Sequence, residues 1–186
     1  MLDPQSEILN ALYQRQPADA MRLADAAGSL TIWEAAALGR DTDVERVLLA
    51  DAALATAYAP DGHVPLGLAA FFAHPSTVRL LLAHGADVHA AARNEMQVQP
   101  LHAAVAGRSL EATVAILDAG AGPNARQQAG YTALMGAAAA GRHDLVDLLL
   151  ARGADPALLE DAGKSAAAIA EEHGQPAIAK RLGSAV

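Results

Sequence analysis

The sequence predicts an all-α protein built as a solenoid, in which short pairs of antiparallel helices stack side by side. A helix-starting pattern recurs along the chain at steps of 33, 35, 33 and 33 residues, at positions Ile32, Pro65, Pro100, Ala133 and Ala166. A glycine also follows each of three Leu-rich segments, at Gly85, Gly120 and Gly153. Self-similarity at this period indicates stacked helix pairs.

The stretch from Gly130 to Asp155 defines the repeated unit. Thr132 suits an N-cap, where its hydroxyl accepts from a free backbone N–H of the first turn. Gly141 ends this first helix, because glycine adopts the left-handed C-cap conformation at no steric cost. A second apolar face follows over 142–150 and stops at Gly153.

Composition and charge exclude several function classes. Hydrophobic residues make up 53% of the 186 residues but aromatic residues only 3%, which suits thin helices in close contact. The net charge of −8 argues against binding nucleic acid or an acidic membrane surface. There is no cysteine, no signal-like start at residues 1–4 and no apolar run of membrane-spanning length. We therefore expect a cytoplasmic protein.

The segment 6–30 is predicted to be an N-terminal cap. Ser6 is a suitable N-cap for a helix over 7–14, and Pro17 opens a second helix that runs through Ala27 and closes at Gly28. This pair has the length of a repeat but no loop after it. A solenoid needs such an atypical end to shield its first apolar face.

The rest of the chain divides into regular units within a single domain over 1–186. We expect four repeats and a C-terminal cap, at 31–63, 64–98, 99–131, 132–164 and 165–186. Second helices are expected at 44–50, 77–83, 110–118, 142–150 and 177–182. Trp33 stands where other units have leucine, which favours a core role.

These units resemble the ankyrin repeat family. The resemblance rests on Pro100-Leu101-His102-Ala103-Ala104, on 78–88 and on 145–155, and it covers 31–186 well. It implies L-shaped repeats whose inner helices and finger-like β-turn loops line a concave groove. The segment 93–98 before Pro100 also looks like a form common in bacterial ankyrin proteins.

The sequence departs from the family pattern at two kinds of position. The family histidine, which ties neighbouring repeats by hydrogen bonds, is kept only at His102 and is replaced by Gly67, Met135 and Ala168. Those ties are therefore in doubt. Ala73 stands where glycine would end an inner helix, so we expect a stability cost or a different turn.

No motif for catalysis or for a cofactor emerges. The seven histidines are scattered over turns and helix ends, without the i, i+4 spacing of a helical zinc site. The segment Gly163-Lys164-Ser165 lacks the earlier glycine of a phosphate-binding loop, because Leu158 stands there. We predict no enzyme activity, no metal and no cofactor.

The resemblance places partner contacts at the ends of inner helices and at the finger tips. On this chain, those positions are His63, Phe71, Phe72, Arg93, Asn94, Glu95, Met96, Val98, Arg126, Gln127, Gln128, Tyr131, Ala139 and Lys164. Aromatic and methionine side chains in an alanine-lined groove are typical interface anchors. We expect Phe71, Phe72, Met96 and Tyr131 to lie on one side.

Three hypotheses on function follow. The first is a non-catalytic module, monomeric by itself, that binds a partner protein in a regulatory or scaffolding role. The second is a structural protein that buries the groove in a homo-oligomer. The third, an enzyme, would need two titratable groups that converge in a closed pocket.

Overall fold

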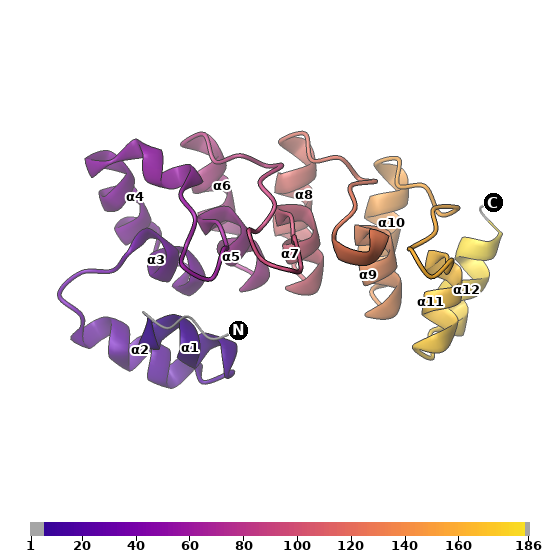
Figure 1. The fold of residues 1–186 in the computed structure, drawn as a ribbon, viewed down its shortest axis with the longest axis horizontal. Helices are drawn as coiled ribbons and strands as arrows, with labels where there is room; N and C mark the ends of the chain where they lie inside the picture. Colours follow the sequence, from indigo (N-terminus) through magenta and orange to yellow (C-terminus); the bar gives the residue numbers. More distant parts are fainter. Residues whose placement is uncertain (1–5, 185–186) are drawn as a thin grey trace.

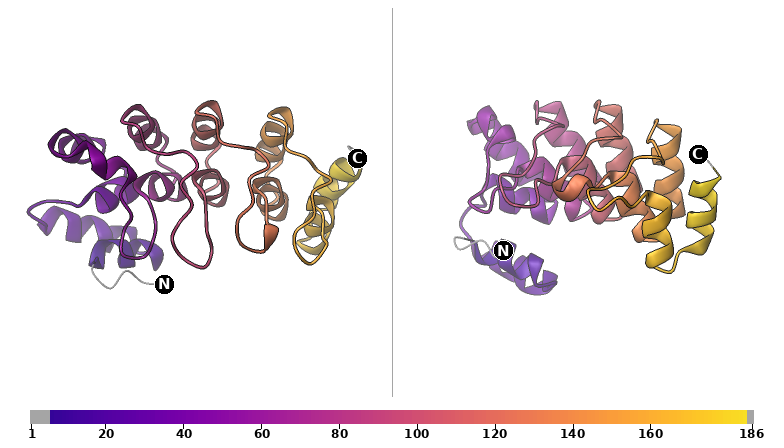
Figure 2. Two further views of the ribbon diagram at one scale, coloured as in Figure 1. Left: turned by 45° about the horizontal axis from the view of Figure 1, so that its top comes forward. Right: turned by 45° about the vertical axis from the view of Figure 1, so that its right-hand side comes forward.

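The computed structural model describes residues 6–184 and shows a row of helix pairs (Figures 1 and 2). The α-helices are α1 (Glu7–Tyr13), α2 (Pro17–Ala26), α3 (Ile32–Leu38), α4 (Asp41–Ala50), α5 (Pro65–Phe71), α6 (Pro75–Ala83), α7 (Pro100–Ala106), α8 (Leu110–Asp118), α9 (Ala133–Ala139), α10 (His143–Ala151), α11 (Ala166–Glu172) and α12 (Pro176–Gly183). Two 3₁₀ turns, η1 (Ala52–Thr56) and η2 (Gln128–Gly130), lie in the connections. The ends of the predicted domain, 1–5 and 185–186, lie outside the described residues.

The helices form two layers. The inner helices α3, α5, α7, α9 and α11 contact one another in series, and the outer helices α4, α6, α8 and α10 form a second row (Figure 1). The fingers are the connections 51–64, 84–99, 119–132 and 152–165, between each outer helix and the next inner helix. They project from one side of the row (Figure 2). The all-α solenoid predicted from the repeat period is confirmed.

Capping residues set the helix starts where the sequence indicated. The hydroxyl of Thr132 accepts from the Met135 N–H at 3.3 Å, and that of Ser6 accepts from the Leu9 N–H at 3.1 Å. Helix α4 begins at Asp41, before the predicted start at 44. Acidic residues stabilise the first turn of a helix, but this turn has no apolar periodicity from which its start could be predicted. Helix α2 ends at Ala26, before the predicted end at Ala27, and Ala27 is extended.

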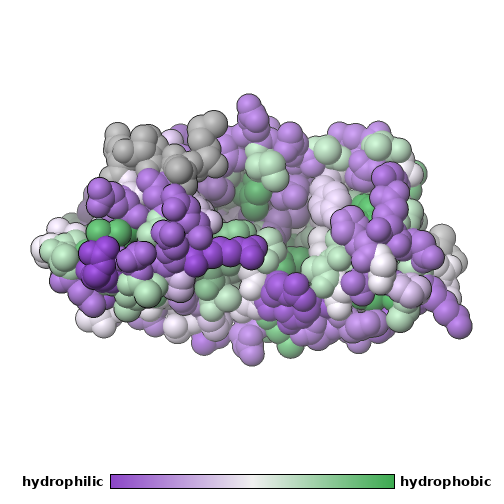
Figure 3. All heavy atoms as spheres, turned by 90° about the horizontal axis from the view of Figure 1, so that it is seen from below, coloured by the Kyte–Doolittle hydropathy of each residue, from purple (hydrophilic) through white to green (hydrophobic). Residues whose placement is uncertain are grey.

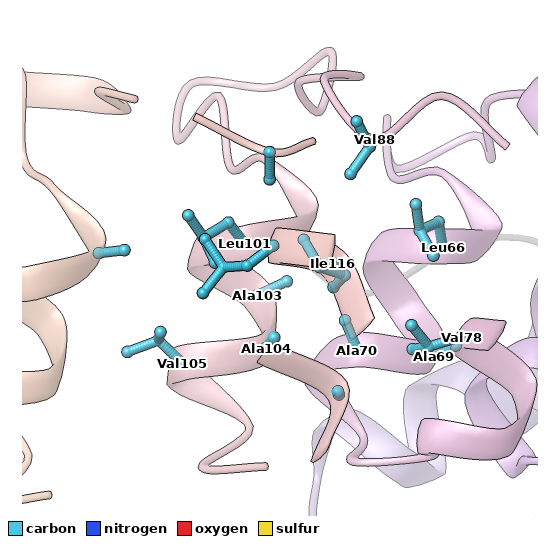
Figure 4. Packing of buried hydrophobic residues seen from close by; sticks show 14 of the residues in the cluster. Leu66, Ala69, Ala70, Val78, Val88, Leu101, Ala103, Ala104, Val105 and Ile116 are labelled. Atoms are coloured by element: carbon cyan, nitrogen blue, oxygen red, sulfur yellow. The ribbon is translucent and has the colours of Figure 1, made fainter. Parts of the chain in front are cut away.

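Alanine lets the inner helices approach closely. Ala69 and Ala70 of α5 and Ala104 of α7 are fully buried where these helices pack, and Leu66 and Leu101 fill the space toward the fingers (Figure 4). Gly107 is needed for the same contact, since an added Cβ would lie 2.4 Å from the carbonyl oxygen of Phe71. Trp33 packs against the core, as expected, and donates its indole N–H to the Ala57 carbonyl.

Ala73 ends α5 without any change of turn. It adopts φ +61°, and the His74 N–H donates to the Ala69 carbonyl. Gly39 ends α3 with φ +69° and the same pattern of backbone bonds. The expected stability cost therefore comes from holding Ala73, which has a Cβ, in the left-handed backbone region.

Fingers are tied to one another through their backbones. Each of the last three fingers donates one backbone N–H to a carbonyl of the finger before it, 31 or 32 residues earlier. These bonds are Arg93 N–H to Gly62 at 2.8 Å, Gln128 N–H to Met96 at 3.2 Å and Asp161 N–H to Ala129 at 2.9 Å. His102 forms a hydrogen bond through Nε2 with the Ala125 carbonyl at 3.1 Å, and Ala125 lies in the finger of the same unit, 99–131. At Met135 the side chain accepts only from the Thr132 N–H of its own repeat.

Candidate functional site: a groove along the inner helices

A hollow of about 520 Å³ runs along α5, α7 and α9 and under their fingers. Gly67, Ala103, Ala106, Gly136 and Ala140 leave room for it, because the inner helices carry small side chains there. Figure 3 shows the molecule from below, with a hollow near the middle that has hydrophobic residues at its floor. The groove is thus a consequence of the glycine- and alanine-rich inner helices.

Seven of the predicted contact residues line this groove. They come from the inner helices and from three fingers, and they are His63, Phe71, Met96, Val98, Gln127, Tyr131 and Ala139. Phe71 and Met96 are 43% and 51% exposed, so much of their apolar surface is open to solvent. The structure therefore gathers residues from positions 63 to 139 on one apolar surface.

The other seven predicted residues lie outside the groove. They are Phe72, Arg93, Asn94, Glu95, Arg126, Gln128 and Lys164. Several have contacts within or between fingers: the Arg93 guanidinium lies 3.7 Å from the centre of the Tyr58 ring, and Lys164 pairs with Glu172 at 2.8 Å. Asn94 donates to the Asp61 carbonyl and accepts from the Met96 N–H, so it fixes the shape of the finger 84–99.

The two phenylalanines face different surroundings. Their rings are perpendicular, with centroids 5.1 Å apart. Phe71 lines the groove, whereas Phe72 is half-buried among Leu9, Leu68 and Tyr13. A second hollow of about 510 Å³ lies between this pair and the end of α1. The expected common side thus holds for Phe71 but not for Phe72.

Tyr13, from the N-terminal helix pair, closes one end of the groove. Its hydroxyl donates to Asp61 Oδ2 at 2.8 Å, and its ring lies 6.5 Å from that of His63 and 5.8 Å from that of Phe72. This segment is predicted to be a cap, and no local pattern in the sequence connects it to the groove. Residue 13 lies next to residues 61–72 because α1 packs against α3.

The groove is uncharged over most of its lining near neutral pH. Burial lowers the pKa of His63 and of His102, and it raises the pKa of Tyr131, with Glu160 as a smaller cause. Arg108 is the one arginine among the lining residues, and no aspartate or glutamate is among them. Such a lining suits apolar contacts with a few hydrogen bonds and offers no carboxylate for acid–base catalysis.

Within residues 6–184, no group of three or more His, Cys, Asp or Glu side chains is placed to hold a metal ion. None of the helices described in that range is long and apolar enough to cross a membrane.

A family model described as ankyrin repeats, in three copies, matches residues 32–127 and again residues 101–185. A search of curated proteins finds no match. The two matched ranges together span the helix pairs from α3 to α12.

Proposed function

Since this chain belongs to the ankyrin repeat family, whose repeats are generally protein–protein interaction modules, we propose that it binds a partner protein through the inner groove. No enzyme domain is found in the chain. The role we propose is regulatory or scaffolding, without catalysis. The partner would lie across the middle repeats, with its anchor side chains in the groove.

The observation that carries the proposal is the exposed apolar surface of the groove. Phe71 and Met96 of the unit 64–98 and Tyr131 of the following unit line one hollow. A few such side chains supply most of the binding free energy of an interface when a partner removes them from water. Because the repeats are already folded, the partner need not order this surface on binding.

The predicted finger residues outside the groove form its polar surroundings. Arg93, Glu95 and Gln128 are exposed on fingers next to the hollow, and Lys164 lies one finger further along. Polar groups at the rim of an interface exclude water and set orientation while adding little affinity. We assign these residues to orientation of the partner.

The test is capture of a partner by the immobilised full chain. A variant with Phe71→Ala, Met96→Ala and Tyr131→Ala should lose a partner that the wild type retains from a native lysate, as measured by mass spectrometry. The matched control is Met21→Ala, Leu49→Ala and Leu159→Ala, which truncates exposed apolar residues away from the groove. Circular dichroism verifies helicity in both variants. Equal capture by the groove variant and the control would reject this surface.

Self-association is the second candidate, because a second copy would also cover Phe71 and Met96. We propose that the chain by itself is a monomer. Sedimentation velocity over a wide range of concentrations separates the two readings. A dimer that the groove variant abolishes would favour the structural role.

A further inference from the structure

Phe71 borders two hollows, and each of them has one arginine in its lining. The groove contains Arg108, and the second hollow, beside the end of α1, contains Arg15. All three residues are exposed. An exposed aromatic ring therefore has a guanidinium group in each of the hollows that it borders.

Neither arginine has an acidic partner within the chain. Ion pairs with an aspartate or a glutamate hold seven other basic side chains, but within residues 6–184 neither Arg15 nor Arg108 forms one. The guanidinium of Arg108 donates to the Ala140 carbonyl at 3.2 Å. This neutral acceptor orients the group and leaves its charge uncompensated.

The backbone holds both arginines in the same unusual conformation. Arg15 and Arg108 each have φ +59°, in the left-handed region that favours glycine. Arg108 stands where Gly39 and Gly141 end the inner helices of other units. Residues held in this region cluster at ligand-binding sites, where the surrounding structure compensates for their strain. The conformation therefore favours a role for the side chains.

The charges around Phe71 select the sign of the occupant. The whole chain has 21 acidic and 13 basic residues, yet no aspartate or glutamate lines either hollow. Asp61, beside the groove, already accepts from the Tyr13 hydroxyl at 2.8 Å and from the His63 N–H at 3.1 Å. A cationic group would thus find no carboxylate in the lining. A carboxylate would find an exposed guanidinium, with which it forms short and strong hydrogen bonds.

The net charge of the chain distinguishes an acidic protein segment from a nucleic acid. A nucleic acid carries a charge at every phosphate, so most of its charges would lie over the remainder of a chain whose net charge is −8. Salt screens charges beyond about 8 Å, so a few carboxylates respond mainly to the arginines they touch. A protein segment can also place an apolar side chain between its carboxylates.

We propose that Arg15, Phe71 and Arg108 together bind an acidic segment of the partner protein. An apolar side chain of that segment contacts Phe71, and carboxylates before and after it pair with the two arginines. This inference rests on the proposed function. A second copy of the chain is disfavoured as the occupant, because two chains of net charge −8 repel each other.

The experiment titrates short blocked peptides into the ¹⁵N-labelled full chain and measures affinity from amide shifts. Each peptide has a central leucine and a glutamate on either side of it, at spacings of one, two or three residues. Each has a counterpart with glutamine in place of glutamate. At the best spacing the glutamate peptide should bind about tenfold more tightly, about threefold for each exposed ion pair. Shifts should centre on Arg15, Phe71 and Arg108, and the preference should fall as salt is added.

Equal binding of the glutamate and glutamine peptides at every spacing would overturn the inference. So would the absence of binding by any of the peptides, or shifts confined to other parts of the chain.

Variants connect the preference to the two arginines. Arg15→Gln and, separately, Arg108→Gln should each reduce the preference for glutamate about threefold. The matched control is Arg79→Gln on α6, which removes an exposed basic residue that forms no ion pair within 6–184 and lines neither hollow. It should leave the preference intact. If Arg108→Gln fails to fold, Arg15→Gln alone decides. A preference that survives both substitutions contradicts the assignment.

Two further measurements test the other occupants. A short oligothymidylate that binds this surface more tightly than every glutamate peptide would make it a nucleic-acid site and overturn the inference. A dimer in sedimentation velocity that Arg15→Gln or Arg108→Gln dissociates would make a second copy the occupant. A monomer that does not bind the oligonucleotide, together with the glutamate preference, supports the acidic segment.

The outcome is separable from that of the partner-capture test. Capture that depends on Phe71, Met96 and Tyr131, together with no preference for glutamate, rejects the acidic segment and leaves the proposed function in place. Capture that is unaffected by those three substitutions rejects the proposed function, whatever the peptides do.

Discussion

At the level of single residues, the ends of the inner helices show how the repeat tolerates substitution. Gly39 and Gly141 adopt φ +69°, and the equivalent positions in two other repeats are occupied by Ala73 and Arg108, at φ +61° and +59°. The turn therefore persists where glycine is absent. The two non-glycine residues are held there by the packing of the helices they join.

Replacing Ala73 with glycine should stabilise the protein. Relief of the left-handed strain outweighs the extra backbone entropy of the unfolded chain, for a net gain of about 0.5 kcal/mol. Urea unfolding followed by circular dichroism measures the change. Ala115→Gly, inside α8, is the contrasting variant and should cost about 1 kcal/mol or more. Destabilisation by both variants would show that the Ala73 side chain contributes contacts that exceed its strain.

Three histidines should make the stability of the fold depend on pH. Burial is the main reason that the pKa values of His63, His74 and His102 fall below the usual 6.5. Below pH 6.5 the unfolded chain takes up protons at these sites before the folded chain does. The free energy of unfolding should therefore decrease as the pH falls from 6.5 toward the folded-state pKa values.

The contribution of one histidine to that dependence is measurable. His102→Gln keeps a donor for the Ala125 carbonyl but removes the titrating group, so the urea midpoint should change less between neutral and mildly acidic pH. His89→Gln, at an exposed position, is the control and should behave as the wild type. A His102→Gln variant with an unchanged pH dependence would assign the effect to other groups.

At the level of elements, the fingers are joined by a polar contact between two repeats. The amide of Asn124 donates to the Gly153 carbonyl at 3.0 Å, and its oxygen accepts from the Asp155 N–H at 2.7 Å. One side chain thus satisfies two backbone groups at the end of α10. The two hydrogen bonds therefore join two neighbouring fingers.

Asn124→Ala should cost about 1–2 kcal/mol, because two hydrogen bonds are lost at an exposed site. Asn124→Asp keeps the acceptor and loses the donor, so it should have an intermediate effect. Thermal unfolding followed by circular dichroism measures both. The exposed neighbour Gln128, replaced by alanine, should change stability very little. Equal stability of Asn124→Ala and the wild type would mean that water replaces both bonds without cost.

At the level of the whole molecule, stability should decrease toward the ends of the row. Each inner helix packs against its own outer helix and the inner helices beside it, and α1 reaches the row mainly through α3. In such an array the end units open first, since they have neighbours on one side only. The groove lies over the middle repeats, where we expect the most persistent structure.

Native-state hydrogen exchange tests this gradient. Amides of α1, α2 and α12 should exchange fastest, and those of α7 should exchange slowest. Tyr13→Ala removes the ring contacts with His63 and Phe72, so it should speed exchange in α1 while leaving α11 unchanged. Uniform protection from α3 to α12 would instead indicate one cooperative unit.

The local pattern of the chain determined the fold. The period of about 33 residues, the caps at Ser6 and Thr132 and the glycine at Gly141 specify helix pairs and their order, because each acts within one or two turns of its own helix. Helix ends were predicted to within a few residues. The acidic start of α4 and the two 3₁₀ turns were missed, since neither has an apolar period.

Only the tertiary structure decided which residues share a surface. Phe71 and Phe72 are neighbours in sequence, yet one lines the groove and the other packs toward α1, because successive residues of a helix point about 100° apart. Tyr13 reaches the groove because α1 packs against α3. These placements arise from packing between units, which no local pattern encodes.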